Sequence, residues 1–200
     1  MVNLEDYRAL FMMATLGLAL VAASPMFGVI LPFGRGSERF SEFWLLGPDH
    51  MTEGYPFNVR AGEEYSVFVG VGNHMGSSEY YKVCVKFCNG TQSLPDGKGG
   101  VPSSLSPVYE YRFFVGADEV WQSPMSFGFG DVVVEGDALS VGEVVVDGVT
   151  FPVDVFAVWD SEREGYFFQL FFELWRYDVD SHSFSFDDRF VGLWLNMTAS

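Results

Sequence analysis

The chain has 200 residues, of which 48% are hydrophobic and 18% aromatic, and this composition excludes a disordered protein. It contains 27 Asp and Glu against 11 Lys and Arg, which gives a formal net charge of -16. Because nucleic-acid affinity comes from counterions released around a basic surface, this balance excludes nucleic acid as the default partner.

The N-terminal part contains one long apolar segment. Residues 9–33 carry no charged side chain, and as a helix they would run about 37 Å against a hydrocarbon core of about 30 Å. A cleaved signal peptide is the alternative, because Ala22-Ala23-Ser24 offers the small residues that a signal peptidase accepts. The apolar run continues for several residues beyond Ser24, and acidic residues precede it. We therefore predict an uncleaved, single-pass transmembrane helix over 9–33.

Two observations bear on the side of the membrane to which the rest of the chain belongs. Arg8 precedes the span and Arg35 and Arg39 follow it, which weakly favours a cytoplasmic C-terminal part. The acceptor patterns for N-glycosylation at Asn89 and Asn196 matter only outside the cytoplasm. A short N-terminus, one span and a large acidic domain are a common arrangement for surface proteins. We predict that residues 1–8 are cytoplasmic and that residues 34–200 form an extracytoplasmic domain of a cell-membrane protein.

The two cysteines, Cys84 and Cys88, stand four positions apart. In a straight strand such positions lie about 13 Å apart, whereas a disulfide needs Cα atoms within about 7 Å. A local disulfide would need a bend near Phe87, so a bridge and two reduced thiols both remain open. Cys-x3-Cys without paired histidines does not indicate a zinc site.

Alternation of apolar and polar residues predicts strands in the first half of the domain. Residues 40–46 read as a first strand, followed by a turn-rich segment as far as Gly62. Two further strands place alternate residues of 65–71 and 81–87 in the core. The second of these puts both cysteines on its more polar side.

A long loop of Gly, Pro and Ser over residues 89–107 precedes a strand over 108–115. Gly116-Ala117-Asp118 is typical of a hairpin turn. In the region 128–160, Asp147-Gly148 predicts a two-residue hairpin, and we expect an inserted β-hairpin or ribbon there.

Two long strands over residues 166–177 and 190–197 close the domain. No stretch after residue 33 shows the apolar stripe of a helix bounded by caps. The fold class is therefore mainly β: an antiparallel sandwich of immunoglobulin-like type after one transmembrane helix.

Several motifs follow one another in this domain: Phe40-Ser-Glu-Phe-Trp-Leu-Leu-Gly47, Tyr55-Pro56, Gly62-Glu63, Val69-Gly-Val-Gly-Asn-His74, Tyr81-Lys-Val83, Phe171-Phe-Glu-Leu-Trp175 and Phe190-Val-Gly-Leu-Trp-Leu-Asn196. In this order they resemble an archaeal membrane-protein family catalogued as domain of unknown function 1616. Residues 128–160 have no counterpart in this resemblance. It implies a membrane-anchored extracytoplasmic β-sandwich with no established reaction, sometimes considered beside surface-glycan functions. The single span departs from the longer members.

Catalytic and cofactor motifs do not emerge from the sequence. Asp178, Asp180 and Asp187 gather oxygen ligands near the last turn and are weak candidates for a metal site, because a solvated acidic loop is the simpler interpretation. His74 after a strand is either a general base or a turn residue, and the turn is the simpler interpretation. We predict no catalytic residue and no cofactor.

Three functions remain compatible with these observations. The first is a non-enzymatic surface module that binds another envelope protein or a glycan, which predicts an exposed aromatic patch. The second is a catalytic or accessory part of glycan assembly or trimming, which needs two converging carboxylates; adjacent acidic pairs such as Glu63-Glu64 are too common here to indicate it. The third is a structural subunit of a membrane complex, with Ala14 and Gly17 on a packing face of the span. The five tryptophans are expected mostly in the core.

Overall fold

The structure, a computed structural model, describes residues 7–8, 11–18 and 39–198, and it divides into the units Met1–Glu38 and Arg39–Ser200. In the first unit, residues 11–18 are helical. Most of the predicted span 9–33 lies outside the described residues. Among the described residues, no helix combines the length and the apolarity needed to cross a membrane.

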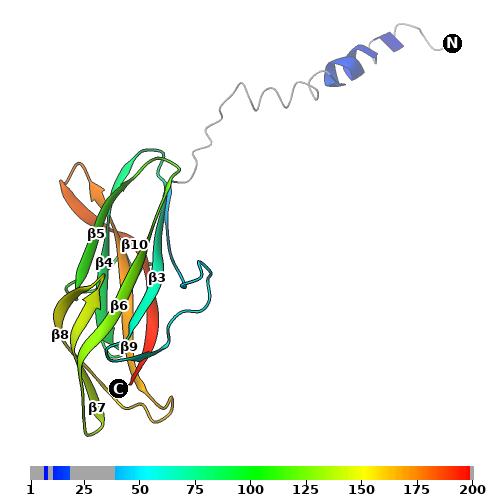
Figure 1. Ribbon diagram of the computed structural model, residues 1–200. Helices are drawn as coiled ribbons and strands as arrows, with labels where there is room; N and C mark the ends of the chain where they lie inside the picture. The colour runs from blue at the N-terminus through cyan, green and yellow to red at the C-terminus, as the bar shows by residue number, and fades with distance from the viewer. Residues whose placement is uncertain (1–6, 9–10, 19–38, 199–200) are drawn as a thin grey trace. The chain divides into compact units, whose positions relative to one another are not determined.

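The second unit is built from strands packed in two layers (Figure 1). Its described part contains β1 (Phe40–Leu46), β2 (Asn58–Arg60), β3 (Glu64–His74), β4 (Glu79–Asn89), β5 (Tyr109–Val115), β6 (Val120–Glu135), β7 (Ala138–Val146), β8 (Val149–Val158), β9 (Tyr166–Asp178) and β10 (Ser183–Thr198). The prediction of a mainly β, sandwich-like domain is confirmed.

One sheet has the strand order β1-β3-β6-β7-β8 and is called here the β6 sheet; the other has the order β2-β10-β9-β4-β5 and is called the β9 sheet. Neighbouring strands are antiparallel except β2, which pairs in parallel with the end of β10. β2 lies within the segment before Gly62 that the sequence predicts to be turn-rich. The sequence does not reveal this strand, because three residues are too few to show an alternation.

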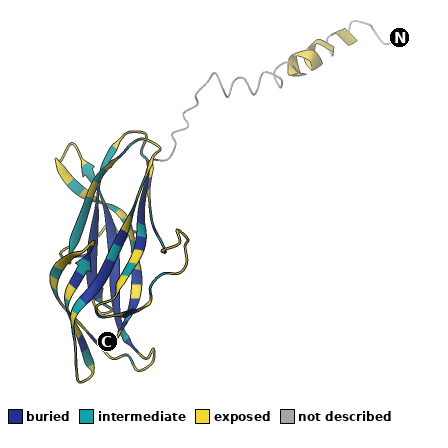
Figure 2. Cartoon of the chain, in the orientation of Figure 1, coloured by how far each residue is buried: buried dark blue, intermediate teal, exposed yellow. Residues whose placement is uncertain are grey.

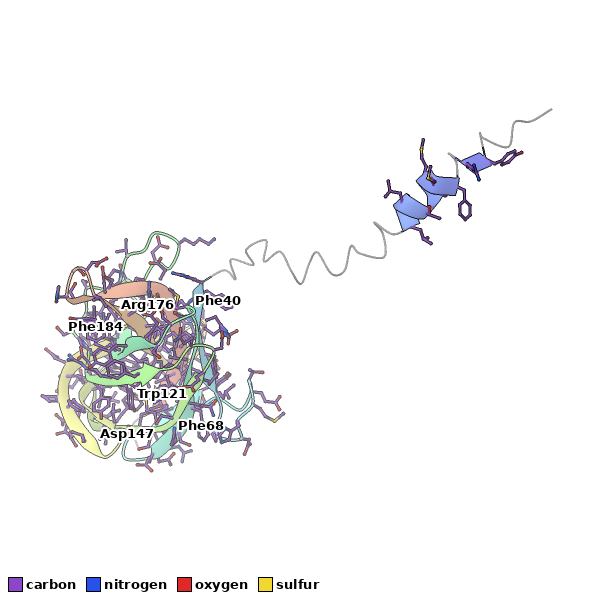
Figure 3. All side chains as sticks on the ribbon, turned by 90° about the horizontal axis from the view of Figure 1, so that it is seen from above. Phe40, Phe68, Trp121, Asp147, Arg176 and Phe184 are labelled. Carbon is purple, nitrogen blue, oxygen red and sulfur yellow. The ribbon has the colours of Figure 1, made fainter. Side chains whose placement is uncertain are left out.

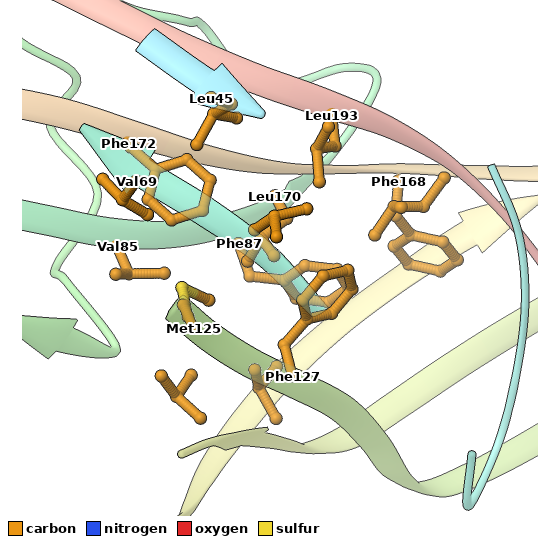
Figure 4. Packing of buried hydrophobic residues seen from close by; sticks show 14 of the residues in the cluster. Leu45, Val69, Val85, Phe87, Met125, Phe127, Phe168, Leu170, Phe172 and Leu193 are labelled. Atoms are coloured by element: carbon orange, nitrogen blue, oxygen red, sulfur yellow. The ribbon is translucent and has the colours of Figure 1, made fainter. Parts of the chain in front are cut away.

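The core lies between the sheets and follows the predicted alternation. Val67, Val69 and Val71 of β3 are at most 1% exposed, and they face a row of fully buried β9 side chains that includes Phe168 and Leu170. Figure 4 shows Phe87, Phe127 and Phe168 close together, contributed by β4, β6 and β9. Full burial of such side chains stabilises a fold by about 1.5–3 kcal/mol each.

The predicted hairpin at Gly116-Ala117-Asp118 is wrong. β5 belongs to the β9 sheet and β6 to the β6 sheet, so this turn carries the chain across the sandwich. Asn73, which is fully buried, holds the crossing: its Nδ2 donates to the carbonyl oxygens of Val115 and Gly116 at 2.9 and 3.0 Å. The turn residues were read correctly, but a local turn signal does not say which sheet the next strand joins.

The region 128–160 forms the second half of β6 and the strands β7 and β8. The two-residue hairpin at Asp147-Gly148 is confirmed, with positive φ at both residues and Val146 paired with Val149. Leu139, the second residue of β7, has no exposed surface. The segment predicted as an inserted ribbon therefore supplies part of the common core of the sandwich.

The outer face of the β9 sheet is partly covered, and Figure 2 shows its central strands dark along much of their length. The loop between β4 and β5 lies over this face, because Lys86 Nζ donates to the Ser103 carbonyl at 2.8 Å and Ser103 N donates to Glu173 at 2.7 Å. Lys86 and Glu173 also form an ion pair. This loop divides the outer face into two open regions, one at each end.

Candidate functional site

The first open region of the outer face carries a row of aromatic side chains. Tyr80 pairs with Phe114 across β4 and β5, and Phe184 pairs with Tyr177 across β10 and β9. The next row along the strands contains Trp175 and Phe186, which are also paired. The name aromatic face is used here for these six residues together with the cations beside them: Tyr80, Phe114, Trp175, Tyr177, Phe184, Phe186, Lys82 and Arg112.

The rings of the aromatic face contact one another across four strands. Tyr80 stacks on Phe114 with ring centroids 4.4 Å apart, and it lies 5.1 Å from Phe184, which is 5.3 Å from Tyr177. Phe114 is 74% exposed and belongs to β5, an edge strand of the β9 sheet. Seen from above, Phe184 lies on the side of the β9 sheet and Phe68 on the side of the β6 sheet (Figure 3). The other five rings are half-buried. A cluster of rings that reaches the surface at an exposed phenylalanine is characteristic of a contact surface.

Two cations accompany these rings. Lys82 Nζ lies 4.9 Å from the Trp175 ring centroid and 5.1 Å from that of Phe184, and the Arg112 guanidinium lies 5.6 Å from that of Phe184. Glu110 binds both cations, at 3.3 Å from Lys82 and 2.7 Å from Arg112. Partial burial raises the pKa of the Glu110 carboxyl, but the Arg112 hydrogen bond and the Lys82 charge outweigh it and hold that pKa below its ordinary value. The aromatic face thus holds two cations that share one carboxylate.

A polar hollow of about 430 Å³ adjoins the aromatic face. Arg176 binds two of its carboxylates: Arg176 Nε lies 3.2 Å from Asp187 Oδ1, and Nη1 lies 3.7 Å from Glu79 Oε2. Asp178 instead accepts hydrogen bonds from the backbone of its own turn, first from Asp180 N at 2.9 Å, and these lower the pKa of its carboxyl.

The predicted metal ligands Asp178, Asp180 and Asp187 are therefore not brought together. Asp187 lies in a β-bulge of β10 and pairs with Arg176, while Asp178 and Asp180 belong to the β9–β10 turn. In residues 7–8, 11–18 and 39–198, no group of three potential ligands is close enough to hold a metal ion. The spacing of the three aspartates suggested a metal site, but it shows neither the β-bulge at Asp187 nor the ion pair of Asp187 with Arg176.

At the other end of this face, a hollow of about 380 Å³ lies between the end of β4, the start of β9 and the edge strand β8 of the β6 sheet, and it is called the Asn89 hollow. Its lining includes Asn89, Thr91, Phe156, Val158, Arg163 and Phe167. The Arg163 guanidinium lies 4.5 Å from the Phe167 ring centroid and pairs with Asp160 at 2.7 Å. Trp194, which is 46% exposed, lies beside Gly90.

Asn89 is the last residue of β4, and hydrogen bonds within the acceptor pattern Asn89-Gly90-Thr91 close the turn that follows. Its Oδ1 accepts hydrogen bonds from Thr91 N at 3.0 Å and from Thr91 Oγ1 at 2.7 Å, and its Nδ2 donates to the Phe156 carbonyl at 2.7 Å. The second acceptor pattern has different surroundings: Asn196 Nδ2 donates to Asn58 at 3.1 Å and its Oδ1 accepts from Tyr166 N at 3.2 Å. Asn196 thus joins β2 and β9 to β10.

Cys84 and Cys88 are free thiols, buried on the covered outer face of β4. β4 runs without interruption from Glu79 to Asn89, so the bend that a bridge needs is absent from this strand. Burial raises the pKa of each thiol to about 11. The side predicted as more polar is buried because the loop over residues 90–107 covers it.

His74, considered as a base, lies at the end of β3 between two carboxylates. Its Nε2 is 3.5 Å from Glu42 and its Nδ1 is 3.5 Å from Asp118, and its ring lies 4.8 Å from that of Phe40. These contacts join β1 to the turn before β6. The arrangement is that of a structural histidine, as the turn interpretation implies.

The sequence predicts the tryptophans mostly in the core, with one or two exposed on a sheet face; Trp121 packs against the core and two others are exposed. None of the five is among the fully buried residues of the described domain, and Trp159 and Trp194 are 45% and 46% exposed. Sequence reasoning also did not single out the aromatic face. The available signal was the set of outward-facing rings at Tyr80, Phe114 and Tyr177, on the opposite parity from the core residues.

Comparisons with solved structures give low similarity. A chain in the complex of zinc 2-glycoprotein and prolactin inducible protein from human seminal plasma is 8% identical, with 82% of this chain and 100% of that chain covered and a TM-score of 0.36. A PapD-like domain of human CEP192 is 9% identical, with 85% and 92% covered and a TM-score of 0.31. A β-glucosidase from Listeria innocua is 15% identical over 59% of this chain and 16% of that chain, with a TM-score of 0.28.

No curated protein matches the sequence. A family model does match, over residues 35–131, which include β1 to β5 and most of β6. The resemblance inferred from the motifs between Phe40 and Val83 is confirmed over this range, whereas the closing strands β9 and β10 lie outside it. The matching model describes a domain of unknown function, DUF1616, and the similarity of this chain to it extends over residues 35–131.

Proposed function

We propose that the protein is a membrane-anchored surface module with an immunoglobulin-like sandwich, and that it binds another envelope protein through the aromatic face. The anchor is the uncharged segment 9–33, and the domain after it is extracytoplasmic. The observation that carries the binding function is the exposure of Phe114. This side chain is 74% exposed and lies on β5, an edge strand of the β9 sheet.

The composition of the aromatic face favours a protein partner. Tyr, Trp and Arg are the residues that dominate binding energy in protein interfaces, and Tyr80, Trp175 and Arg112 contribute one of each. The rings stack against one another rather than standing apart, so they present a continuous contact area. The free edge of β5 also offers backbone hydrogen bonds to an added strand.

The alternative, a part of glycan assembly or trimming, needs two carboxylates about 5–10 Å apart across a cleft. The nearest arrangement in the described domain is the polar hollow, where Glu79 and Asp187 are both paired with Arg176. The Asn89 hollow contributes one carboxylate, Asp160, which is paired with Arg163. No specific contact therefore favours catalysis over binding.

Site-specific photocrosslinking in intact cells tests the proposal. The full chain carries benzoylphenylalanine at position 114, and a matched chain carries it at Phe57, which is 48% exposed and lies before β2. We expect a discrete protein adduct from position 114 and none from position 57. Equal adducts at both positions, or none at 114, would overturn the proposal, and an adduct with glycan alone would replace the protein partner by a glycan.

A quantitative variant supports the same test. Removing a central interface ring commonly weakens binding by on the order of tenfold or more. We therefore expect Phe114→Ala to reduce recovery of the crosslinked partner by about that factor when a second crosslinking position on β5 is used, while Phe57→Ala leaves recovery unchanged. Unchanged recovery with Phe114→Ala would place the contact elsewhere.

A further inference from the structure

The two N-glycosylation acceptor patterns differ in their structural surroundings. Thr91 Oγ1 donates to its own asparagine, at 2.7 Å from Asn89 Oδ1, so that pattern forms a compact turn at the end of β4. Thr198 Oγ1 instead lies 3.4 Å from the Val59 carbonyl and serves the β2–β10 pair. The first pattern begins at the last residue of β4 and continues into the turn, whereas the second lies within β10 as far as its last residue.

The room around the two amide groups also differs. Asn196 packs so closely on Gly165 that a Cβ there would overlap the Asn196 side chain. Both polar atoms of the amide are hydrogen-bonded in Asn89 as well as in Asn196, so the difference lies in the space around the side chain. Asn89, in contrast, lines a hollow of about 380 Å³. Its Nδ2 has two hydrogens, of which the Phe156 carbonyl needs one.

The Asn89 hollow has the chemistry of a sugar-contacting surface. Phe156 and Val158 of the edge strand β8 are each 55% exposed, and Trp194 beside Gly90 is 46% exposed. Flat aromatic surfaces accept the apolar faces of sugar rings, and the Asp160–Arg163 pair offers hydrogen-bond acceptors and donors to hydroxyl groups. In a protein without an attached glycan, these apolar groups would remain uncovered.

We propose that Asn89, and not Asn196, carries an N-linked glycan, and that the first sugar of this glycan occupies the Asn89 hollow against Phe156 and extends past Gly90 to the neighbouring Trp194. The proposal rests on the extracytoplasmic placement of the domain in the proposed function. It also gives the exposed part of β8 a cover, since a bulky glycan at its edge blocks the addition of a foreign strand.

The modification is a glycosyl transfer from a polyprenyl-phosphate-linked oligosaccharide by a membrane transferase. A bond forms between the anomeric carbon of the sugar and Asn89 Nδ2, and the bond from that carbon to the phosphate oxygen of the carrier breaks. Nδ2 loses one proton to a base, and the carrier leaves as a phosphate anion. The remaining N–H of Asn89 still donates to the Phe156 carbonyl, so the observed hydrogen bond is kept.

The first test is peptide mass spectrometry of the full chain isolated from its native cells, after labelling of the intact cells with a membrane-impermeant amine reagent. Lys98, exposed on the loop between β4 and β5, reports on the side of the membrane. We expect a labelled Lys98, a glycan on the Asn89 peptide and a bare Asn196 peptide.

The other outcomes separate this inference from the proposed function. A labelled Lys98 with a bare Asn89 overturns the inference and leaves the surface module intact. A Lys98 that is labelled only after lysis, with a bare Asn89, overturns both the extracytoplasmic placement and the inference. A glycan on Asn196 overturns the selection between the two sites.

Matched variants test which asparagine carries the glycan and where its first sugar binds. Thr91→Ala should remove the glycan mass completely, whereas Thr198→Ala should leave it unchanged. If the sugar contacts Trp194, then Trp194→Ala should lower the Tm of the glycosylated chain by about 2–4 °C more than it lowers that of the Thr91→Ala chain, the shift expected for a modest contact in a domain of this size. Equal Tm shifts in the two backgrounds would overturn the proposed contact between the sugar and Trp194.

Discussion

Lys86 and Glu173 form an ion pair inside the protein, with 2.8 Å between Nζ and Oε2 and with 3% and 0% of the two side chains exposed. The pair lies on the outer face of the β9 sheet, beneath the loop between β4 and β5. Glu173 accepts two more hydrogen bonds, from Ser103 N at 2.7 Å and from Trp175 Nε1 at 3.1 Å. The pair thus fastens the loop over the sheet and ends beside Trp175 of the aromatic face.

Removing one partner of this pair should be strongly destabilising. A buried charge left without its partner costs about 3–5 kcal/mol, so we expect Glu173→Gln and Lys86→Met each to lower the free energy of unfolding by about that amount. Chemical denaturation of the isolated domain measures this. The exposed pair Arg163–Asp160 is the control, and Arg163→Met should change stability by about 1 kcal/mol or less. Similar losses for the two pairs would contradict the buried role of Lys86.

The double variant Lys86→Met/Glu173→Leu separates the charge pair from the loop that it fastens. Apolar replacement of both partners often restores stability, so we expect the double variant to be more stable than either single variant. Its loop should nevertheless open, because Ser103 loses both of its contacts. Faster hydrogen exchange at Ser103 with a recovered midpoint of unfolding is the expected result.

The cysteines should titrate in the alkaline range. Burial raises the pKa of Cys84 and Cys88 from 9.0 to about 11, so the folded state keeps its protons where the unfolded state loses them. The stability that this contributes is fully present below pH 9 and is lost as the pH rises through 11. We expect the free energy of unfolding to fall between pH 9 and pH 11, and the fall to be smaller in Cys84→Ala/Cys88→Ala.

The same burial predicts that both cysteines react slowly with thiol reagents in the folded protein. At pH 8 only about one thiol in a thousand is ionised in the folded state, and the thiolate is the reactive form. A thiol reagent should therefore modify neither cysteine in the native protein and both after unfolding. Rapid modification of either thiol at pH 8 would show that the loop over residues 90–107 does not stay closed.

The face between the cysteines and Glu173 shows where reading the sequence succeeds and where it stops. Alternation in β4 and β9 assigned the inward residues correctly, because a strand repeats every two residues. It could not show that the outward residues are buried too, since their cover comes from a loop without periodicity. A single Glu in the apolar run Phe171-Phe172-Glu173-Leu174 was the signal for a buried partner.

Reading the region 128–160 as an insertion predicted that its deletion leaves a folded domain. The structure predicts the opposite, because Leu139, Val141, Val144 and Val146 are at most 1% exposed and belong to the common core. Deleting 128–160 should abolish cooperative unfolding. As a milder test, Leu139→Ala should cost about 2–5 kcal/mol, whereas Val133→Ala, on the exposed side of β6, should cost far less. Equal losses of stability in the two variants would mean that residues 128–160 form a ribbon independent of the core.

Gly70 and Trp44 are paired across β3 and β1, and a Cβ on Gly70 would overlap the Trp44 indole. The sequence resemblance included both residues but gave no reason for them; the register supplies it, since the indole lies over the bare backbone of the glycine. We expect Gly70→Ala to lower stability by about 1–3 kcal/mol, the usual cost of overpacking. Denaturation melts of the isolated domain check this.

The contact, rather than the glycine alone, should be responsible for that cost. If the overlap with Trp44 is the cause, then Gly70→Ala should be nearly neutral or stabilising in a Trp44→Ala background, because alanine suits a strand interior better than glycine does. A double-mutant cycle measures the difference, and contacting residues commonly couple by 0.5–3 kcal/mol. Gly62, with a φ of 78° and open space around it, is the control: there Gly62→Ala should be destabilising in both backgrounds alike. A cycle without coupling would mean that backbone conformation, and not the indole, requires glycine at position 70.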